Sequence, residues 1–348
     1  MPRVGSASAP PQRGARAALL PAGQTGGVAA LSPGRRRALL VARRAYAVVL
    51  LAVVAWVLVT RGDDVVDLVR GARPAVLLAC LLAAYGQLAL TSAVWTSGLR
   101  ALGTDVPWAT SLQATAESGP ARYLPGSVWY ALSRGVALQR TGVPVRALAA
   151  VATLETLLVP VIGFAVGGVL LAATGTAVGG ALSVPVVLAA VALLALTTPP
   201  VVNRALRVRA GDGPPLRLSW PAQGRLVAWI TVFWLWSGSV FALYVSAFPA
   251  ATDSGPVTAV GAYMVAWGVG WLALFAPQGI GVFEVVLAGL LAGGGAGLAL
   301  VLAGYRALIV VRDLSAAAVA LALRRRARAA GGPGAAPGAS GAETAESR

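Results

Sequence analysis

The sequence contains no lysine, no histidine and a single cysteine, and only 11% of its 348 residues are charged. Without histidine there is no imidazole for acid–base chemistry or metal ligation, and without lysine there is no Schiff base and no P-loop. The single cysteine, Cys80, excludes an internal disulfide and a cysteine metal cluster. Because soluble domains carry about 25% charged residues, the composition indicates a membrane protein instead.

Hydrophobic residues make up 57% of the chain and gather in long runs. A helix needs about 20 apolar residues to cross the hydrocarbon core of a bilayer. Such runs predict six membrane-spanning helices, at residues 39–60, 74–99, 147–174, 180–202, 226–248 and 298–323. The segments at the two ends, residues 1–38 and 324–348, are rich in Arg, Pro, Gly and Ala. We expect them to be disordered tails around one membrane domain at residues 39–323.

Two further apolar stretches are broken by glycine and proline. The first, residues 107–139, is interrupted at Gly119-Pro120 and again at Pro125-Gly126. The second, residues 256–292, is interrupted at 277–281, and the 11 residues that follow rise only about 16 Å as a helix. Each stretch therefore predicts a re-entrant hairpin, one in each of two inverted halves of an all-α polytopic protein.

An alternative topology has eight full spans, with residues 256–276 and 282–302 both crossing the membrane. We favour six spans and two hairpins, because paired Gly/Pro-interrupted segments in inverted halves are typical of transporter binding sites.

The net charge of +16 comes entirely from arginine. The arginines lie between and beside the apolar runs, where membrane proteins keep their cytoplasmic charge, which argues against a nucleic-acid partner. Clusters at residues 35–44, 204–225 and 324–328 place both termini in the cytoplasm. Arginine without lysine, together with abundant Ala, Gly and Pro, indicates a GC-rich bacterial genome. We therefore expect a multi-pass protein of a bacterial inner membrane.

Charged residues inside apolar runs are the best candidates for function, because each costs about 2.5–3.5 kcal/mol to insert. Glu155 lies within the third predicted span, where it either binds a cation, an amine or a proton or pairs with a buried arginine. Arg306 and Asp313 are seven residues apart and share a helix face. They predict either a phosphate-binding arginine steadied by an acid or an internal ion pair. Arg312 is nearer the cytoplasmic end and is expected to snorkel to the interface.

The two broken segments predict anion sites. The first break frees backbone N–H groups at a helix start, and Arg122 and Arg134 add guanidinium groups that suit phosphate. The alternative is a cytoplasmic amphipathic loop resting on anionic lipid. The second break also frees backbone N–H groups at a helix start, and Glu284 lies in the first turn after it. The predicted substrate-binding residues are Glu117, Arg122, Pro125, Gly126, Trp129, Arg134, Glu155, Pro277, Gly279, Gly281, Glu284 and Arg306.

We predict that the charged members of this set converge on one polar cavity near mid-membrane, because five charged groups cannot each face lipid. They are Arg122, Arg134, Glu155, Glu284 and Arg306. No metal or cofactor site is predicted.

Two motifs resemble those of a known family. Residues 122–129, RYLPGSVW, with Arg134 downstream, resemble the "(K/R)YLPGxxW…R" block of the lysylphosphatidylglycerol synthase transmembrane-region family. Residues 277–284, PQGIGVFE, look like its later "PxGxGxxE" block. The resemblance covers roughly residues 39–323. It implies a flippase-like protein that moves a lipid with an anionic headgroup, or a lipid-linked saccharide, between leaflets. Relatives encoded beside glycosyltransferases make such an enzyme a candidate partner.

The sequence departs from the full synthase in one respect. Only the 25 residues 324–348 follow the last predicted span, whereas the synthase carries a large soluble aminoacyl-transferase domain. We therefore expect no lipid lysylation and no enzymatic activity. One alternative is a membrane-embedded glycosyltransferase, for which Asp105 and Glu117 are the only nearby acid pair. Another is a non-catalytic partner of such an enzyme.

Overall fold

The computed structural model describes residue 60 and residues 62–123, 128–175, 177–208, 216–248, 252–273, 279–291 and 296–330. Every regular element within these ranges is a helix, so the predicted all-α class is confirmed. The first predicted span, at residues 39–60, lies outside the described residues apart from Thr60. The short helix α2 (Gly62–Gly71) follows it.

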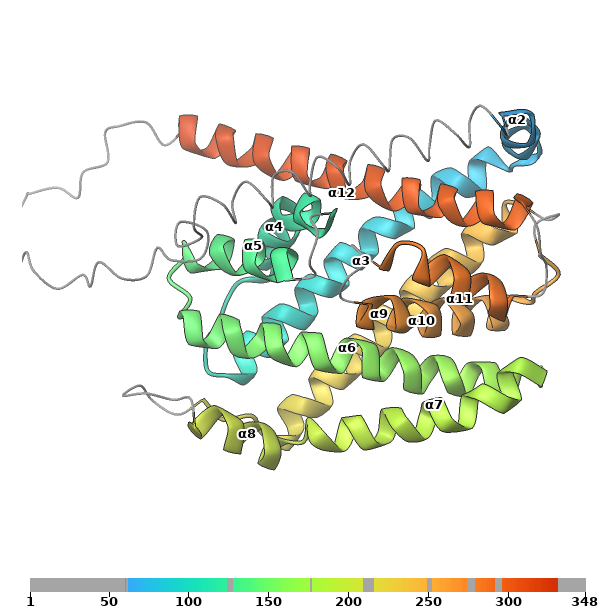
Figure 1. Ribbon diagram of the computed structural model, residues 1–348. Helices are drawn as coiled ribbons and strands as arrows, with labels where there is room; N and C mark the ends of the chain where they lie inside the picture. The colour runs from blue at the N-terminus through green and yellow to red at the C-terminus, as the bar shows by residue number, and fades with distance from the viewer. Residues whose placement is uncertain are drawn as a thin grey trace, which may run out of the picture. The chain divides into compact units, whose positions relative to one another are not determined.

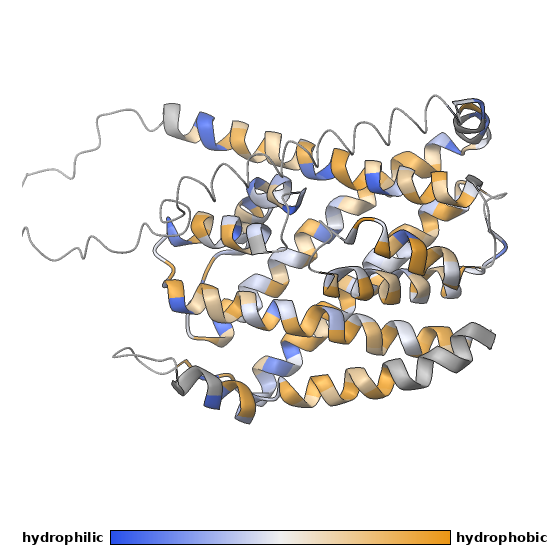
Figure 2. Ribbon diagram, viewed as in Figure 1, coloured by the Kyte–Doolittle hydropathy of each residue, from blue (hydrophilic) through white to orange (hydrophobic). Residues whose placement is uncertain are grey.

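Three helices are long and apolar enough to cross a membrane: α3 (Pro74–Ala101), α6 (Val145–Ala173) and α9 (Trp220–Ser246). They confirm three of the predicted spans to within a few residues. Figure 2 shows hydrophobic residues along most of their length. Large apolar side chains on their outer faces, such as Leu82 and Leu157, are exposed. Such faces suit contact with lipid tails, because transfer from water to lipid is favourable for them.

The predicted span at residues 180–202 is wrong at its end. The structure has α7 (Ala177–Leu196) and then a separate helix, α8 (Pro199–Val208). Proline disfavours helical backbone in the residue before it but fits the first turn of a new helix. The hydroxyls of Thr197 and Thr198 each donate to a carbonyl three residues earlier and so close the end of α7.

The last helix, α12 (Ala296–Ala330), is the longest at 35 residues. It passes the expected end of the membrane domain, so residues 324–330 of the predicted C-terminal tail are helical. Hydrophilic residues interrupt its apolar surface near its middle as well as at its end (Figure 2).

Both Gly/Pro-broken stretches form helical hairpins. The first consists of α4 (Trp108–Ser118), the 3₁₀ turn η1 (Gly119–Tyr123) and α5 (Val128–Gln139). The second consists of α10 (Pro256–Leu272) and α11 (Val282–Leu290). At about 1.5 Å per residue, the 9 to 12 residues of α4, α5 and α11 are too short to cross the hydrocarbon core. Because α11 ends at Leu290 and α12 begins at Ala296, the alternative single span over residues 282–302 is not found.

The two hairpins lie toward opposite ends of α12 (Figure 1). Arg140, just beyond α5, lines a surface hollow with Arg324 and Arg325 from the C-terminal part of α12. In contrast, α11 ends six residues before α12 begins. The hairpins therefore approach the centre of the helix layer from opposite directions (Figure 1).

Glycine allows the second hairpin to pack closely. A Cβ atom on Gly167 of α6 would lie 2.9 Å from the carbonyl oxygen of Gly261 in α10, so only small residues permit this approach. At the turn of the hairpin, Gly279 has a φ of +63°, and a Cβ there would lie 2.6 Å from the Cα of Gly270. The turn is thus pressed against the end of α10.

Replacing Gly279 with alanine tests this packing. We expect Gly279→Ala to destabilise the protein by about 2–4 kcal/mol, because left-handed backbone and overpacking both oppose the added methyl group. Gly281 has a φ of +87° but open space around it. Gly281→Ala should therefore lower the stability only by the cost of left-handed backbone, without overpacking. Gly289→Ala, inside α11 and also in open space, should be neutral or stabilising. Melting curves in detergent measure all three, and equal melting points for all three would contradict the packing.

Candidate functional site

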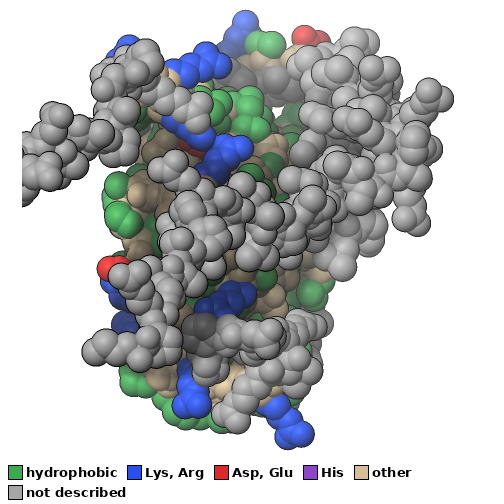
Figure 3. All heavy atoms as spheres, turned by 90° about the vertical axis from the view of Figure 1, so that its left-hand side faces the viewer, with side chains coloured by type: hydrophobic (Ala, Val, Ile, Leu, Met, Phe, Trp, Pro, Cys, Tyr) green, Lys and Arg blue, Asp and Glu red, His purple; other side chains and the backbone are tan. Residues whose placement is uncertain are grey.

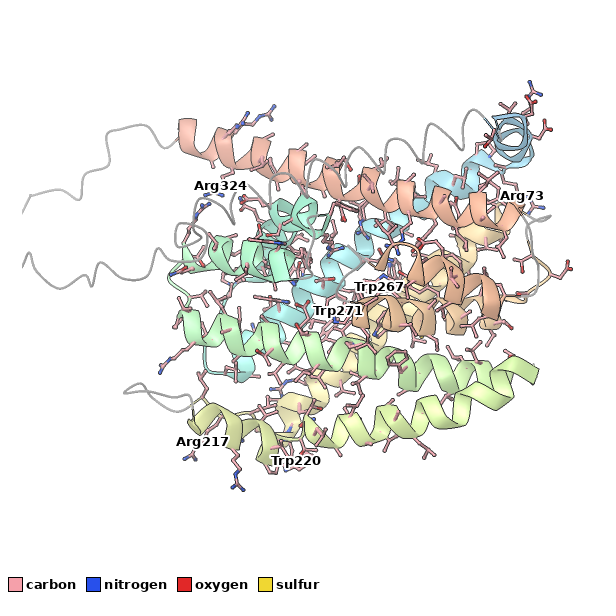
Figure 4. All side chains as sticks on the ribbon, in the orientation of Figure 1. Arg73, Arg217, Trp220, Trp267, Trp271 and Arg324 are labelled. Atoms are coloured by element: carbon pink, nitrogen blue, oxygen red, sulfur yellow. The ribbon has the colours of Figure 1, made fainter. Side chains whose placement is uncertain are left out.

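The turns of the two hairpins meet at a pair of neighbouring cavities of about 80 and 50 Å³. The first hairpin contributes Arg122, and the second contributes Gly270, Gly279 and Phe283 to the larger cavity. Figure 4 shows Trp267 and Trp271 of α10 in the middle of the helix layer, far from the labelled arginines at its ends. The cavities share five lining residues: Thr91, Arg122, Phe233, Trp267 and Phe283.

Arg134 and Glu155 form an ion pair beside the cavities. Nη2 of Arg134 lies 2.7 Å from one carboxylate oxygen of Glu155 and 3.0 Å from the other. The Arg134 side chain is fully buried, with its guanidinium carbon 4.0 Å from the ring centre of Trp95 and 4.3 Å from that of Tyr130. Its Nε and Nη1 atoms have no hydrogen-bond partner among the described residues. Glu155 lines the larger cavity, so the ion pair lies at the wall of that cavity.

Asp313 joins α12 to the first hairpin. One of its oxygens accepts hydrogen bonds from Nε and Nη2 of Arg312, at 3.0 and 2.6 Å. The other accepts from the hydroxyl of Tyr123, at 2.9 Å, and lies 3.7 Å from Nη1 of Arg122. Arg312 also donates to the side chain of Gln87 on α3. Two elements, α12 and η1, therefore contact one buried carboxylate, and α3 is joined to it through Arg312.

Arg122 has the longest ion-pair distance of the four central arginines, 3.7 Å to Asp313 against 2.6–2.8 Å for Arg134, Arg306 and Arg312. It donates a hydrogen bond to the Tyr130 hydroxyl, and its guanidinium carbon lies 4.0 Å from the centre of that ring. Because Arg134 contacts the same ring, the two guanidinium carbons lie less than 9 Å apart. Among the charged residues described, Arg122 alone lines both cavities.

Arg306 and Glu284 form a third pair. Nε of Arg306 donates to Glu284 over 2.8 Å, and the other carboxylate oxygen of Glu284 accepts from the backbone N–H of Gly281 at 2.7 Å. The guanidinium carbon lies 4.6 Å from the ring centre of Phe283. The pair fixes the start of α11 against α12, and Arg306 lines the smaller cavity.

The five charged residues expected to converge do lie around these cavities. Arg122, Glu155 and Arg306 line them, whereas Arg134 and Glu284 are direct ion-pair partners of lining residues.

Two of the alternatives considered for α12 are not found. Arg306 pairs with Glu284 and not with Asp313, because residues seven apart on a helix are about 10 Å apart along its axis, beyond ion-pair reach. Arg312 is buried against Asp313 and does not snorkel, because α3 and the first hairpin cover this part of the helix.

The remaining predicted site residues lie in several places. Gly279 lines the larger cavity, and Gly281 donates to Glu284. Glu117 pairs with Arg324 over 2.7 Å, beside the surface hollow rather than in the central cavities. Trp129 is partly buried in α5. Its neighbour Tyr130, and not Trp129, is among the described residues that line the larger cavity. Pro125, Gly126 and Pro277 lie outside the described residues.

The sequence analysis missed the aromatic wall. Trp267 and Trp271 stack with ring centres 5.0 Å apart, and both line the larger cavity with Phe233 and Tyr130. A signal was present: tryptophan residues usually lie at membrane interfaces, yet these two are four residues apart just before a Gly/Pro break.

Chemically, the site combines guanidinium groups with apolar, aromatic walls. Such a combination suits an anionic headgroup attached to an apolar chain. Within the described ranges, no group of three or more His, Cys, Asp or Glu residues could hold a metal ion. Asp105 and Glu117, the acid pair considered for a transferase, each have their own arginine partner, Arg100 and Arg324.

Comparison with known proteins gives one match. Residues 44–312 match the model of a family described as the lysylphosphatidylglycerol synthase TM region. The matched segment includes both hairpins and the three ion pairs described above, except that Asp313 lies one residue beyond it. No curated protein matches the chain.

The Arg134–Glu155 pair can be tested by removing one partner and then both. We expect Arg134→Ala to lower the free energy of unfolding by about 3–5 kcal/mol, because it leaves a buried carboxylate without a partner. Arg134→Ala combined with Glu155→Ala should recover much of that loss. Arg100→Ala, which removes an exposed pair with Asp105, should change stability by less than about 0.5 kcal/mol. Melting curves in detergent measure the stability of each variant. If the double variant is no more stable than Arg134→Ala, the pairing is contradicted.

Proposed function

The chain belongs to the family of the lysylphosphatidylglycerol synthase transmembrane region, and from this premise we propose that it is a flippase-like protein. It binds a polar-headed or polyprenyl-phosphate-linked lipid and moves it across the membrane without changing it covalently. The observation that carries the proposal is the meeting of two oppositely directed hairpin turns at a cavity lined by arginine and aromatic residues.

The arrangement of the hairpins supports translocation. In inverted-repeat transporters, substrate sites lie near the midplane at discontinuous helices, and the two halves open alternately to each side. Here Arg122 comes from one hairpin and Gly279 from the other, and both contact the same cavity. A shift of either hairpin would therefore open the cavity toward one side while the other stays in place.

The chemistry of the lining supports a lipid as the cargo. A guanidinium group binds phosphate with parallel hydrogen bonds, and such bonds are strong where water is excluded. Thr91, Tyr130 and Glu155 add polar groups to a wall otherwise made of aromatic and aliphatic side chains. The headgroup would occupy the polar part of the cavity, and the acyl or prenyl chains would remain against the apolar helix faces.

We further propose that the protein lies in a bacterial inner membrane with the ends of α5 and α12 in the cytoplasm. The supporting observation is the distribution of arginine. Arg217 and Arg324 lie at one end of the helices and Arg73 at the other (Figure 4). The face at the first end carries several separate arginine patches and little acidic surface (Figure 3). Cytoplasmic loops carry such an excess of positive charge.

A cavity-filling substitution tests whether cargo passes through the site. Thr91 lines both cavities and its hydroxyl donates to the carbonyl of Gln87. We expect Thr91→Phe to slow translocation of a tail-labelled fluorescent phospholipid in proteoliposomes at least about tenfold, or about 1.4 kcal/mol. Thr153 makes the same bond to Ala149 but faces outward, so Thr153→Phe should change the rate less than about twofold.

Melting curves show whether both variants fold, and the mass of the recovered lipid shows whether it was modified. Translocation at the wild-type rate by a folded Thr91→Phe protein would refute a route through this cavity. A change in lipid mass without translocation would instead support the membrane-embedded transferase.

The orientation is tested by labelling cysteines with a membrane-impermeant maleimide. In a Cys80→Ser background, Gln139→Cys lies at the last residue of α5, and Asp253→Cys lies between α9 and α10; both positions are exposed. We expect Asp253→Cys to react in intact spheroplasts and Gln139→Cys to react only in inside-out vesicles. Reaction of both from the same side would contradict hairpins that enter from opposite faces.

A further inference from the structure

The charges that surround the two cavities do not balance. Four arginines are built into the centre of the described helices, and three carboxylates accompany them. These residues are Arg122, Arg134, Arg306, Arg312, Glu155, Glu284 and Asp313. The nearby Glu117–Arg324 pair is neutral by itself. The site as described therefore carries one surplus positive charge.

The short segments that the structure does not describe next to the hairpins leave this count unchanged. Residues 124–127 lie between η1 and α5, and residues 274–278 lie between α10 and α11. Residues 292–295 separate α11 from α12. None of the three segments contains Asp, Glu or Arg, so these segments add no charge to the count made for the described residues.

The surplus charge falls on Arg122. Asp313 already receives two hydrogen bonds from Arg312 and one from Tyr123, and it lies 3.7 Å from Arg122, beyond hydrogen-bond distance. The described hydrogen bond of Arg122 goes to the neutral hydroxyl of Tyr130. Its side chain is only 16% exposed, and it lines both cavities. A buried cation without a full counter-charge is costly, so an anion that enters the cavity is stabilised there.

We propose that the lipid carried by this site bears one negative charge, as a phosphodiester, and that Arg122 neutralises that charge. This inference rests on the proposed function and narrows its substrate class. A lipid diphosphate or a phosphate monoester would bring two or more charges and leave the site negative. A zwitterionic headgroup would leave it positive, and an aminoacylated headgroup with added ammonium groups would increase the positive charge.

A series of lipids that differ in headgroup charge tests whether the site carries one surplus positive charge. The probes are three lipids with identical acyl chains: phosphatidylcholine with no net charge, phosphatidylglycerol with one negative charge, and phosphatidic acid. At about pH 9.5 the monoester of phosphatidic acid is largely dianionic, because a phosphate monoester loses its second proton well below that pH. Binding to the detergent-purified full chain is measured by competition against one fluorescent phospholipid. Wild type should prefer phosphatidylglycerol over phosphatidylcholine at least about tenfold, as for one charge-assisted bond.

Two variants move the surplus charge in opposite directions. Arg122→Gln makes the site neutral, and the preference for phosphatidylglycerol over phosphatidylcholine should fall to within about twofold. Glu284→Gln raises the surplus to two, keeps an oxygen for the N–H of Gly281, and should shift the preference toward phosphatidic acid. Arg100→Gln removes a charge of the same sign from an exposed pair and should leave every preference unchanged.

The outcomes separate the inference from the proposed function. If wild type binds and translocates lipid but prefers phosphatidic acid or phosphatidylcholine, the charge assignment is overturned and the flippase proposal stands. If wild type binds none of the three lipids, the proposed function fails and this inference fails with it. If Arg122→Gln does not fold, the response of Glu284→Gln decides. A Glu284→Gln protein that folds and keeps the wild-type preference overturns the count.

Discussion

The carboxylate of Asp313 is the interaction on which the centre of the structure depends. It lies near the middle of α12, where an unpaired charge would be expensive, and it is fully buried. Arg312 binds it from the same helix, and Tyr123 binds it from the turn of the first hairpin. A Cβ atom on Gly119 would lie 3.3 Å from the backbone oxygen of Asp313, so η1 packs directly on this helix. The position of the first hairpin follows from these contacts.

The second hairpin is fixed by the same kind of chemistry. Glu284 holds the start of α11 to Arg306 of α12 and accepts the N–H of Gly281 at the turn. Both hairpin turns are thus tied to α12 through carboxylates, and the Arg134–Glu155 pair ties α5 to α6. In a medium without water, each charge needs a partner of its own. The set of partners therefore determines where the helices can lie. Among the four arginines described at the centre, Arg122 has the longest ion-pair distance, and it lines both cavities.

Much of the fold followed from composition and spacing. Runs of about 20 apolar residues located α3, α6 and α9, because bilayer thickness sets the length of a spanning helix. Pairs of glycine and proline located the breaks at Gly119 and near Gly279, whereas the isolated Pro160 and Gly167 lie within α6. The cost of buried charge correctly selected Arg122, Arg134, Glu155, Glu284 and Arg306 as neighbours of one site. The end of α7 was placed wrongly, although Pro199 and Pro200 carried the signal.

The pairing of those charges was decided by tertiary structure alone. Spacing along α12 suggested that Arg306 would meet Asp313, but the partner of Arg306 comes from α11 and the partners of Asp313 come from η1. A sequence gives distances along one helix, whereas ion pairs across a membrane domain depend on which helices pack together. The aromatic wall of Trp267 and Trp271 was hidden for the same reason, because only the meeting of the two hairpins encloses it. The sequence by itself determined which residues must avoid lipid, since the cost of exposing them is local. The folded helices determined which of them meet.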